Sequence, residues 1–197
     1  YIMLEKMGEF FFDERLGDYE EHQLNCIDSA HEFYRYTARS LPMHSGCRII
    51  DLAWGTGLEQ DEYFLLNLTA KVTGIDLAPG MLNRLRKKHS EKDLNLILGL
   101  FLMFHLELSN SMYCIGRGLA SFCGWWKIPL YEKLHKSLIT NGYFILTDYF
   151  ALSDKERTFL RKELLRLKTE LNTEDNEFYH YDTLLTVDHE IECLFGS

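Results

Sequence analysis

Two short apolar runs, each followed by turn residues, constrain the fold of this chain more than any other feature. Cys47 to Trp54 is followed by Gly-Thr-Gly, and Lys71 to Ala78 is a β-branched run with an aspartate near its end. Apolar runs of this length, bounded by turn residues, are typical of buried β-strands. A helix is predicted between them at Gln60 to Leu68, so this segment predicts a βαβ unit with parallel strands.

The same alternation continues along the chain. Pro79 opens a helix that runs on from Met81 to His89, because a proline costs nothing where the first-turn N–H is unpaired anyway. Further strands are predicted at Leu94 to Leu100 and Tyr143 to Phe150, the second after a turn at Asn141-Gly142. The remaining helices are predicted at Tyr19 to Leu41, Ile128 to Leu138, Ser153 to Leu171 (capped by Ser153 with Glu156) and Val187 to Leu194. Strands that alternate with helices predict an α/β fold, a three-layer αβα sandwich around a mostly parallel sheet.

Charge and hydropathy narrow the range of partners. The net charge is −9, and a negative surface repels phosphate backbones, so we expect no nucleic-acid partner. The longest apolar stretch, around Leu96 to Leu106, is about half of the ~20 residues that cross a bilayer. We therefore expect no membrane association. The oligomeric state is not predicted.

The cysteines and histidines show no ligand pattern. Five widely spaced cysteines form no C-x-x-C pair, and the histidines form no H-x-x-x-H pair, so no metal site is expected. This cysteine usage favours a reducing compartment, and the first residues lack the order of a signal peptide. The expected location is the cytoplasm.

The turn residues after the two strands carry the chemistry. Gly55 and Gly57 let backbone N–H groups approach a ligand without a Cβ in the way. Asp76, at the end of the second strand, can accept hydrogen bonds from both hydroxyls of a ribose. Together these residues predict a nucleoside-containing cofactor across the carboxyl ends of adjacent strands. A dinucleotide is disfavoured, because the fingerprint G-x-G-x-x-G needs a third glycine where Gln60 stands.

The pattern Asp-x-Ala-x-Gly-x-Gly that begins at Asp51, together with Ile-Asp-Leu-Ala-Pro-Gly-Met at 75–81, resembles the first two motifs of the class I S-adenosylmethionine-dependent methyltransferases. The resemblance covers roughly Arg48 to Leu100 and Ile128 to Phe150. It implies a Rossmann-like fold, S-adenosylmethionine as cofactor and a small-molecule methyl acceptor. It also implies that residues 47–197 bind the cofactor while residues 1–46 form a helical cap, whose Tyr19-Glu-Glu segment acts as a lid, within a single domain.

The resemblance also implies roles for the positions that match the motifs. The main chain of the turn would face the methionyl part, the first acid would support the turn, the second would hold the ribose hydroxyls, and two apolar residues would pack near the adenine. The residues are, in that order, Ala53, Gly55 and Gly57; Asp51; Asp76; and Leu77 and Met81. No catalytic residue is assigned.

Several positions depart from the family pattern. Ala53 replaces the family's first glycine, and Trp54 fills a slot that is usually small. A Cβ and an indole beside the methionyl pocket can narrow or block it. The family sheet closes with a C-terminal strand hairpin, but nothing after Val187 supplies two more strands. We therefore expect that hairpin to be missing and the chain to be truncated.

The segment 101–126 lacks the expected signal for a fourth strand. Ile115 to Trp126 can be encoded by codons that, read one base later, give Ser-Val-Glu-Ala-Leu-His-His-Phe-Val-Asp-Gly, which matches the family's fourth strand and turn. Leu102 to Glu107 permits Asp-Val-Pro-Phe-Gly in the other shifted frame. We hypothesise that about 101–126 is frame-shifted, which the underlying DNA sequence can decide.

Two functional alternatives stay open beside a methyltransferase. The first is a non-catalytic protein that keeps the fold without productive cofactor binding, because of Ala53, Trp54 and the altered segment 101–126. The second, a nicotinamide-dependent dehydrogenase, is disfavoured by Gln60. Binding of S-adenosylhomocysteine or of NAD separates the three.

Overall fold

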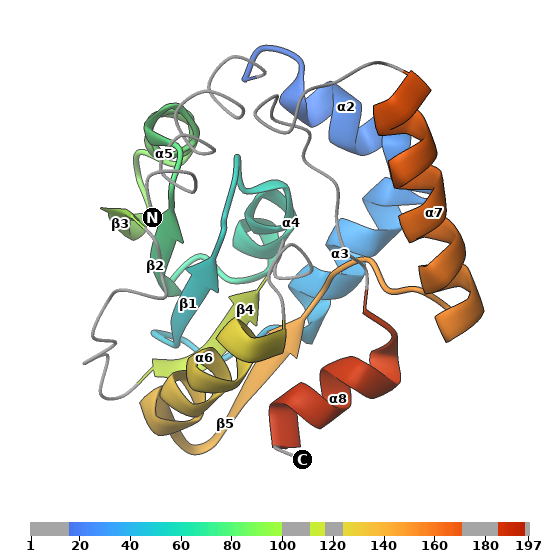
Figure 1. Ribbon diagram of the computed structural model, residues 1–197. Helices are drawn as coiled ribbons and strands as arrows, with labels where there is room; N and C mark the ends of the chain where they lie inside the picture. The colour runs from blue at the N-terminus through green and yellow to red at the C-terminus, as the bar shows by residue number, and fades with distance from the viewer. Residues whose placement is uncertain (1–15, 100–110, 117–123, 171–184, 196–197) are drawn as a thin grey trace. The chain divides into compact units, whose positions relative to one another are not determined.

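The computed structural model describes residues 16–99, 111–116, 124–170 and 185–195. Their strands form one five-stranded sheet in the order β3-β2-β1-β4-β5, in which every neighbouring pair is parallel (Figure 1). The strands are β1 (Arg48–Leu52), β2 (Lys71–Asp76), β3 (Asp93–Leu98), β4 (Ser111–Gly116) and β5 (Leu138–Leu146). The helices are α2 (Tyr19–Cys26), α3 (Ala30–Ser40), α4 (Leu58–Leu66), α5 (Pro79–Lys88), α6 (Gly124–Ser137), α7 (Asp154–Glu170) and α8 (Val187–Phe195). The predicted α/β class is confirmed.

The order of the strands sets where a ligand can bind. The chain moves outward from β1 through β2 to β3 and then returns to the other side of β1 with β4. In open parallel sheets, ligands bind beyond the carboxyl ends of the strands at such a reversal. Gly55 and Asp76 follow or end the two strands on one side of this point, so the topology brings the predicted cofactor residues to the expected edge.

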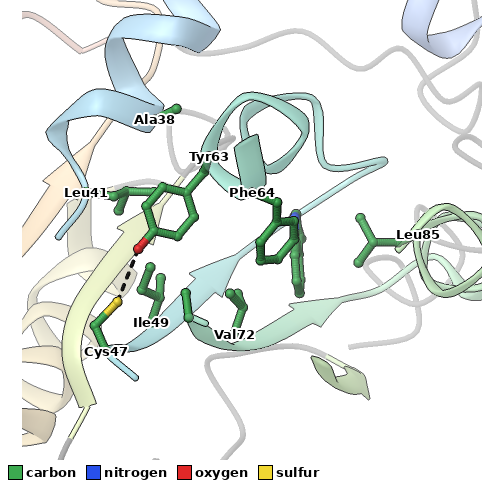
Figure 2. Close-up of a cluster of buried hydrophobic side chains, with 10 residues drawn as sticks. Ala38, Leu41, Cys47, Ile49, Tyr63, Phe64, Val72 and Leu85 are labelled. Carbon is green, nitrogen blue, oxygen red and sulfur yellow. Dashed lines mark hydrogen bonds between the residues drawn. The ribbon is translucent and has the colours of Figure 1, made fainter. Parts of the chain in front are cut away.

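The core of the sheet unit lies where α4 covers β1 and β2. Tyr63 and Phe64 of α4 point at Ile49 of β1 and Val72 of β2, and Leu85 of α5 closes the cluster (Figure 2). All five side chains are buried. Strands with this many buried positions need cover on both faces, which is the physical reason for the layered architecture.

A polar network fixes the loop that leads into β1. The Tyr63 hydroxyl lies 3.1 Å from the Cys47 sulfur (Figure 2). It donates to the Pro42 carbonyl at 2.5 Å. Asn67 Nδ2 donates to the same carbonyl, at 3.2 Å, and to the Tyr63 oxygen, at 3.1 Å. Burial, followed by the interaction with Cys47, raises the pKa of Tyr63 well above its usual range.

The chain divides into two compact units, Tyr1–Arg117 with Lys136–Thr147 and Gly118–His135 with Asp148–Ser197. In the second unit, Lys127 and Tyr131 of α6 both reach Glu190 of α8, and all three side chains are buried. The predicted cap of α7 is confirmed, because Glu156 N–H donates to Ser153 Oγ at 3.3 Å.

Two predictions of secondary structure differ from the structure. The single helix expected from Tyr19 to Leu41 is two helices, because Ser29 adopts a left-handed conformation (φ 54°) between α2 and α3. The turn expected at Asn141-Gly142 lies inside β5. Asn141 is indeed left-handed (φ 67°), but the pairing of β5 with β4 absorbs the irregularity as a shift in register.

A fourth strand is present where the sequence predicted none. β4 lies within the segment 101–126 and pairs with β1 and β5. Residues 100–110 and 117–123 lie outside the described part of the chain, and so does most of the segment covered by the frame-shift hypothesis, which stays untested. Among the described residues after β5, the structure holds α7, α8 and one isolated bridge, between Ala151 and Thr186. No helix in the described ranges is long and apolar enough to cross a membrane.

Candidate functional site

The carboxyl ends of β1 and β2 bring the glycine turn and Asp76 into direct contact. Gly55 N–H donates to Asp76 Oδ2 at 2.7 Å, and Ala78 N–H donates to Asp76 Oδ1 at 2.8 Å. The carboxylate is therefore held in place from the turn and from the start of α5. Asp76 is 9% exposed, so a charged acceptor lies just beneath the surface at this edge of the sheet. The sequence predicted this juxtaposition.

The backbone of the turn is left-handed at three positions. Ala53 has φ 58°, Gly55 has φ 62° and Gly57 has φ 75°, a region that glycine enters freely and alanine does not. Ala53 N–H donates to the Ile75 carbonyl at 2.9 Å, and Gly57 N–H donates to the Trp54 carbonyl at 3.3 Å.

The N–H groups of Ala53, Gly55 and Gly57 thus all donate hydrogen bonds to acceptors within the protein. The expected approach of the Gly55 and Gly57 N–H groups to a ligand stays a prediction. The glycines permit the bend that brings the turn against Asp76.

Asp51 is held by a residue that the sequence showed only as a missing glycine. Gln60 Nε2 donates to Asp51 Oδ2 at 2.5 Å, and both residues are fully buried. This bond ties the end of β1 to the first turn of α4, across the glycine turn. Gln60 therefore fixes the side chain of Asp51, whose support of the turn stays a prediction.

The side chain of Trp54 packs against β2 at Gly74. Its indole is 1% exposed and belongs to the apolar core rather than to the surface edge. A Cβ built on Gly74 of β2 would lie 1.5 Å from Trp54 Cε3, so the ring occupies the space that any other residue at position 74 would fill. Whether the Ala53 Cβ and the indole narrow the methionyl pocket stays a prediction.

Three polar atoms around the turn are buried without a hydrogen-bond partner in the described part of the chain. They are Trp54 Nε1, Thr56 Oγ1 and Gln60 Oε1. Buried polar atoms are nearly always satisfied in native proteins, so such a group marks a place for a polar partner. Because the indole belongs to the apolar core, only Thr56 Oγ1 and Gln60 Oε1 of these three atoms bear on a ligand at the turn.

The apolar residues expected near an adenine lie directly after Asp76. Leu77 is partly exposed, whereas Met81 is 1% exposed, in the first turn of α5. Leu77 is thus the better placed of the two to contact a ligand, and Met81 shapes the wall behind it. No group of three or more potential metal ligands occurs among the described residues.

A residue that sequence reasoning placed only on the predicted lid also reaches this site. A Cβ built on Gly55 would lie 3.2 Å from the hydroxyl oxygen of Tyr19, the first residue of α2. Tyr19 therefore covers the turn directly. No motif in the sequence links the two positions.

No family model matches this sequence, and no curated protein matches it. Solved structures do. The cyclopropane synthase MmaA2 from Mycobacterium tuberculosis matches 82% of this chain and 57% of its own, at 15% identity and a TM-score of 0.66. The YcgJ protein from Bacillus subtilis matches 83% of this chain and 66% of its own, at 14% identity and a TM-score of 0.63. Human N-acetylserotonin methyltransferase, solved with S-adenosylmethionine, matches 82% of this chain and 44% of its own, at 19% identity and a TM-score of 0.57.

The chain thus spans less than two thirds of each of these structures. The likeness extends over most of this chain, and the bend at Gly55 against Asp76 stands at the sheet edge where this topology binds ligands. The chain has the Rossmann-like fold of the class I S-adenosylmethionine-dependent methyltransferases.

Proposed function

We propose that this chain binds S-adenosylmethionine at the carboxyl ends of β1 and β2 and transfers its methyl group to a small molecule. The observation that carries the proposal is the bond between Gly55 N–H and Asp76, which unites the two predicted halves of the site. The fold supports the same conclusion, because similar structures include a methyltransferase solved with S-adenosylmethionine.

The residues present fit an adenosyl group. Each oxygen of Asp76 already accepts one backbone bond, and a carboxylate oxygen can accept a second. We propose that Asp76 takes the two hydroxyls of a ribose, as the family resemblance implies. Leu77, with Met81 behind it, would meet the adenine, as the family resemblance implies.

The turn from Ala53 to Gly57 would hold the methionyl part. Because the N–H groups of Ala53, Gly55 and Gly57 donate hydrogen bonds within the protein, we propose that carbonyl groups of the turn and the hydroxyl of Thr56 face a ligand here. Carbonyl oxygens suit an ammonium group, which donates three hydrogen bonds. Asp51 would contribute only by holding the turn, through Gln60.

S-adenosylmethionine supplies an activated methyl group on a positively charged sulfur. The protein's task is then to hold donor and acceptor in line, which by itself supplies a large part of the rate enhancement. An oxygen or nitrogen acceptor would also need a base. We assign no base, and the acceptor is proposed only as a small molecule.

Calorimetric titration with S-adenosylhomocysteine tests the proposal. We expect micromolar binding by the wild type and at least a tenfold loss in Asp76→Ala. Asp93→Ala is the matched control, because Asp93 begins β3, is exposed and pairs only with Lys71 among the described residues. Circular dichroism should show both variants folded. Absence of binding at millimolar ligand contradicts the proposal.

A non-catalytic protein is the second candidate, and Ala53 favours it. A side chain in a left-handed backbone position stiffens the turn where a ligand would need to enter. This candidate predicts no binding of S-adenosylhomocysteine by the wild type, whereas a dehydrogenase predicts binding of NAD. Parallel titrations with S-adenosylhomocysteine and with NAD therefore separate the three functions.

A further inference from the structure

The helix that carries Tyr19 is held at the site by charge rather than by apolar burial. α2 has no buried residue, although its first side chain covers Gly55. A helix of eight residues is too short to be stable by itself in water. Its position must therefore come from the contacts that its residues make with neighbouring elements.

The main contacts come from two basic residues one turn apart on α5. Arg84 Nη2 lies 3.3 Å from a carboxylate oxygen of Glu20, and Arg84 Nη1 donates to the Leu16 carbonyl at 2.6 Å. Lys88 Nζ lies 3.2 Å from the other oxygen of Glu20. Residues four apart share one face of a helix, so α5 presents both cations to a single carboxylate.

The same lysine joins a third helix to this cluster. Lys88 pairs with Asp61 of α4, and Asp61 Oδ1 lies 2.9 Å from His89 Nε2. α4 and α5 are the helices that follow β1 and β2. The charged cluster therefore connects the segment before the first strand to both elements that frame the proposed cofactor site.

We propose that Arg84 and Lys88 form an ionic latch that holds Tyr19 over the glycine turn, and that opening of this latch limits the exchange of a ligand at the turn. The inference rests on the proposed function only for the nature of that ligand. A further contact of α2, a 3.5 Å hydrogen bond that the Tyr34 hydroxyl donates to Gln23 Oε1, joins the second half of this helix to α3. The end that carries Tyr19 can thus open while the second half stays attached.

The strength of these ion pairs is compatible with reversible opening of α2. Side-chain exposures of 22–35% at Glu20, Arg84 and Lys88 leave each pair partly screened by solvent. Pairs of this kind contribute little individually and weaken as salt is added. A network of several such pairs closes the site and still lets it open on the time scale of ligand exchange.

The test compares Glu20→Gln with Glu21→Gln. Both residues are acids in the first turn of α2, but Glu21 is exposed and forms no ion pair within the described ranges. Arg84→Gln with Arg86→Gln, an exposed neighbour, is the matching pair on α5. Two quantities are measured at low and high salt: hydrogen exchange of residues 16–26 in the free protein, and the dissociation rate of S-adenosylhomocysteine by stopped flow.

We expect Glu20→Gln and Arg84→Gln to speed hydrogen exchange in residues 16–26 and ligand dissociation by roughly threefold to tenfold at low salt. The two control variants should behave like the wild type, and high salt should remove the difference. Equal hydrogen exchange in Glu20→Gln and Glu21→Gln overturns the latch. Faster exchange with an unchanged dissociation rate shows that α2 does not gate the site, which also overturns the proposal. If the wild type binds no S-adenosylhomocysteine, the proposed function fails and so does the gating, while hydrogen exchange still reports separately on the ionic contacts.

Discussion

The indole of Trp54 occupies the space of the side chain that Gly74 lacks. The two residues face each other from the glycine turn and from the middle of β2, with 1.5 Å between Trp54 Cε3 and a Cβ placed at position 74. The indole fits only because position 74 has no side chain, and any larger residue at position 74 would clash with the indole. This pairing also keeps the large ring in the core and away from the edge that holds Asp76.

Gly74→Ala should therefore destabilise the protein strongly. The added methyl group meets two further ring atoms, at 2.1 Å and 2.7 Å, so the indole or the strand must shift. Overpacking of this kind costs roughly 1–3 kcal/mol and sometimes more. Urea unfolding measures the loss, and Gly17→Ala is the control, because a Cβ at Gly17 meets nothing within 4 Å.

The double variant Trp54→Cys/Gly74→Ala tests the pairing itself. With the indole gone, the methyl group at position 74 has room, so the double variant should be more stable than the sum of the single losses predicts. Strictly additive losses would show that the two residues do not depend on each other.

Ala53→Gly should stabilise the protein. Ala53 has φ 58°, where its Cβ crowds the backbone at a cost of roughly 1–2 kcal/mol. Glycine removes that cost, but it also raises the conformational entropy of the unfolded chain, which opposes folding. We therefore expect the free energy of unfolding to rise by about 0.5–1 kcal/mol. Thermal unfolding measures it. Ala38→Gly, inside α3, is the opposite control and should lose about 1–2 kcal/mol, because it loses helix propensity and a buried methyl group.

The sequence was enough to place Asp76 beside the glycine turn, because the carboxyl ends of neighbouring parallel strands meet at one edge. It could not orient Trp54. The period-2 rule ends with β1, and the left-handed backbone at Ala53 decides which way the next side chain points. The sequence also could not show that Gly55 N–H donates within the protein, because its acceptor, Asp76, lies at the end of a different strand.

Contacts between segments that are distant along the chain also could not be predicted from the sequence. Tyr19 meets Gly55 through the packing of α2, and no local pattern encodes that contact. Asn141-Gly142 is the usual signal for a tight turn, and the left-handed residue is where the sequence puts it. The strand nevertheless continues through it, because pairing with β4 overrides the local preference.

Tyr63 should make the protein sensitive to alkali. Burial raises the pKa of its hydroxyl above the unfolded value of about 10, so the folded state holds this proton more tightly. The stabilisation is complete below the unfolded pKa and is lost as the pH rises above it, by up to about 1.4 kcal/mol per pH unit. Urea unfolding at pH 9 and pH 11 should show a steeper loss for the wild type than for Tyr63→Phe.

Two comparisons keep this prediction specific. At pH 7, Tyr63→Phe should cost about 1–2 kcal/mol, because Pro42 and Asn67 lose a partner in a buried network. Tyr36→Phe, at a side chain that is 76% exposed, should keep the alkaline slope of the wild type. A Tyr63→Phe variant with that same slope would assign the alkali sensitivity to another group.

Glu190 of the second unit should be the most sensitive charged position in α8. It accepts bonds from Lys127 and Tyr131, and Lys127 is 1% exposed. Glu190→Gln leaves the ammonium of Lys127 buried without its counter-charge, which typically costs about 3–5 kcal/mol. Urea unfolding measures the loss in free energy of unfolding, and hydrogen exchange of α8 shows whether this helix opens. Arg166→Gln, which removes exposed ion pairs on α7, should change the midpoint little.

Replacing Lys127, Tyr131 and Glu190 together distinguishes two energies: the cost of leaving a buried charge unpaired and the stabilisation that the ion pair itself provides. In the triple variant Lys127→Met/Tyr131→Phe/Glu190→Leu, no polar group of the cluster is left buried without a partner. Because well-packed apolar residues often match or exceed a buried ion pair, the triple variant should regain most of the stability that Glu190→Gln loses. If it is no more stable than Glu190→Gln, the ion pair and the tyrosine hydroxyl themselves stabilise the contact between α6 and α8.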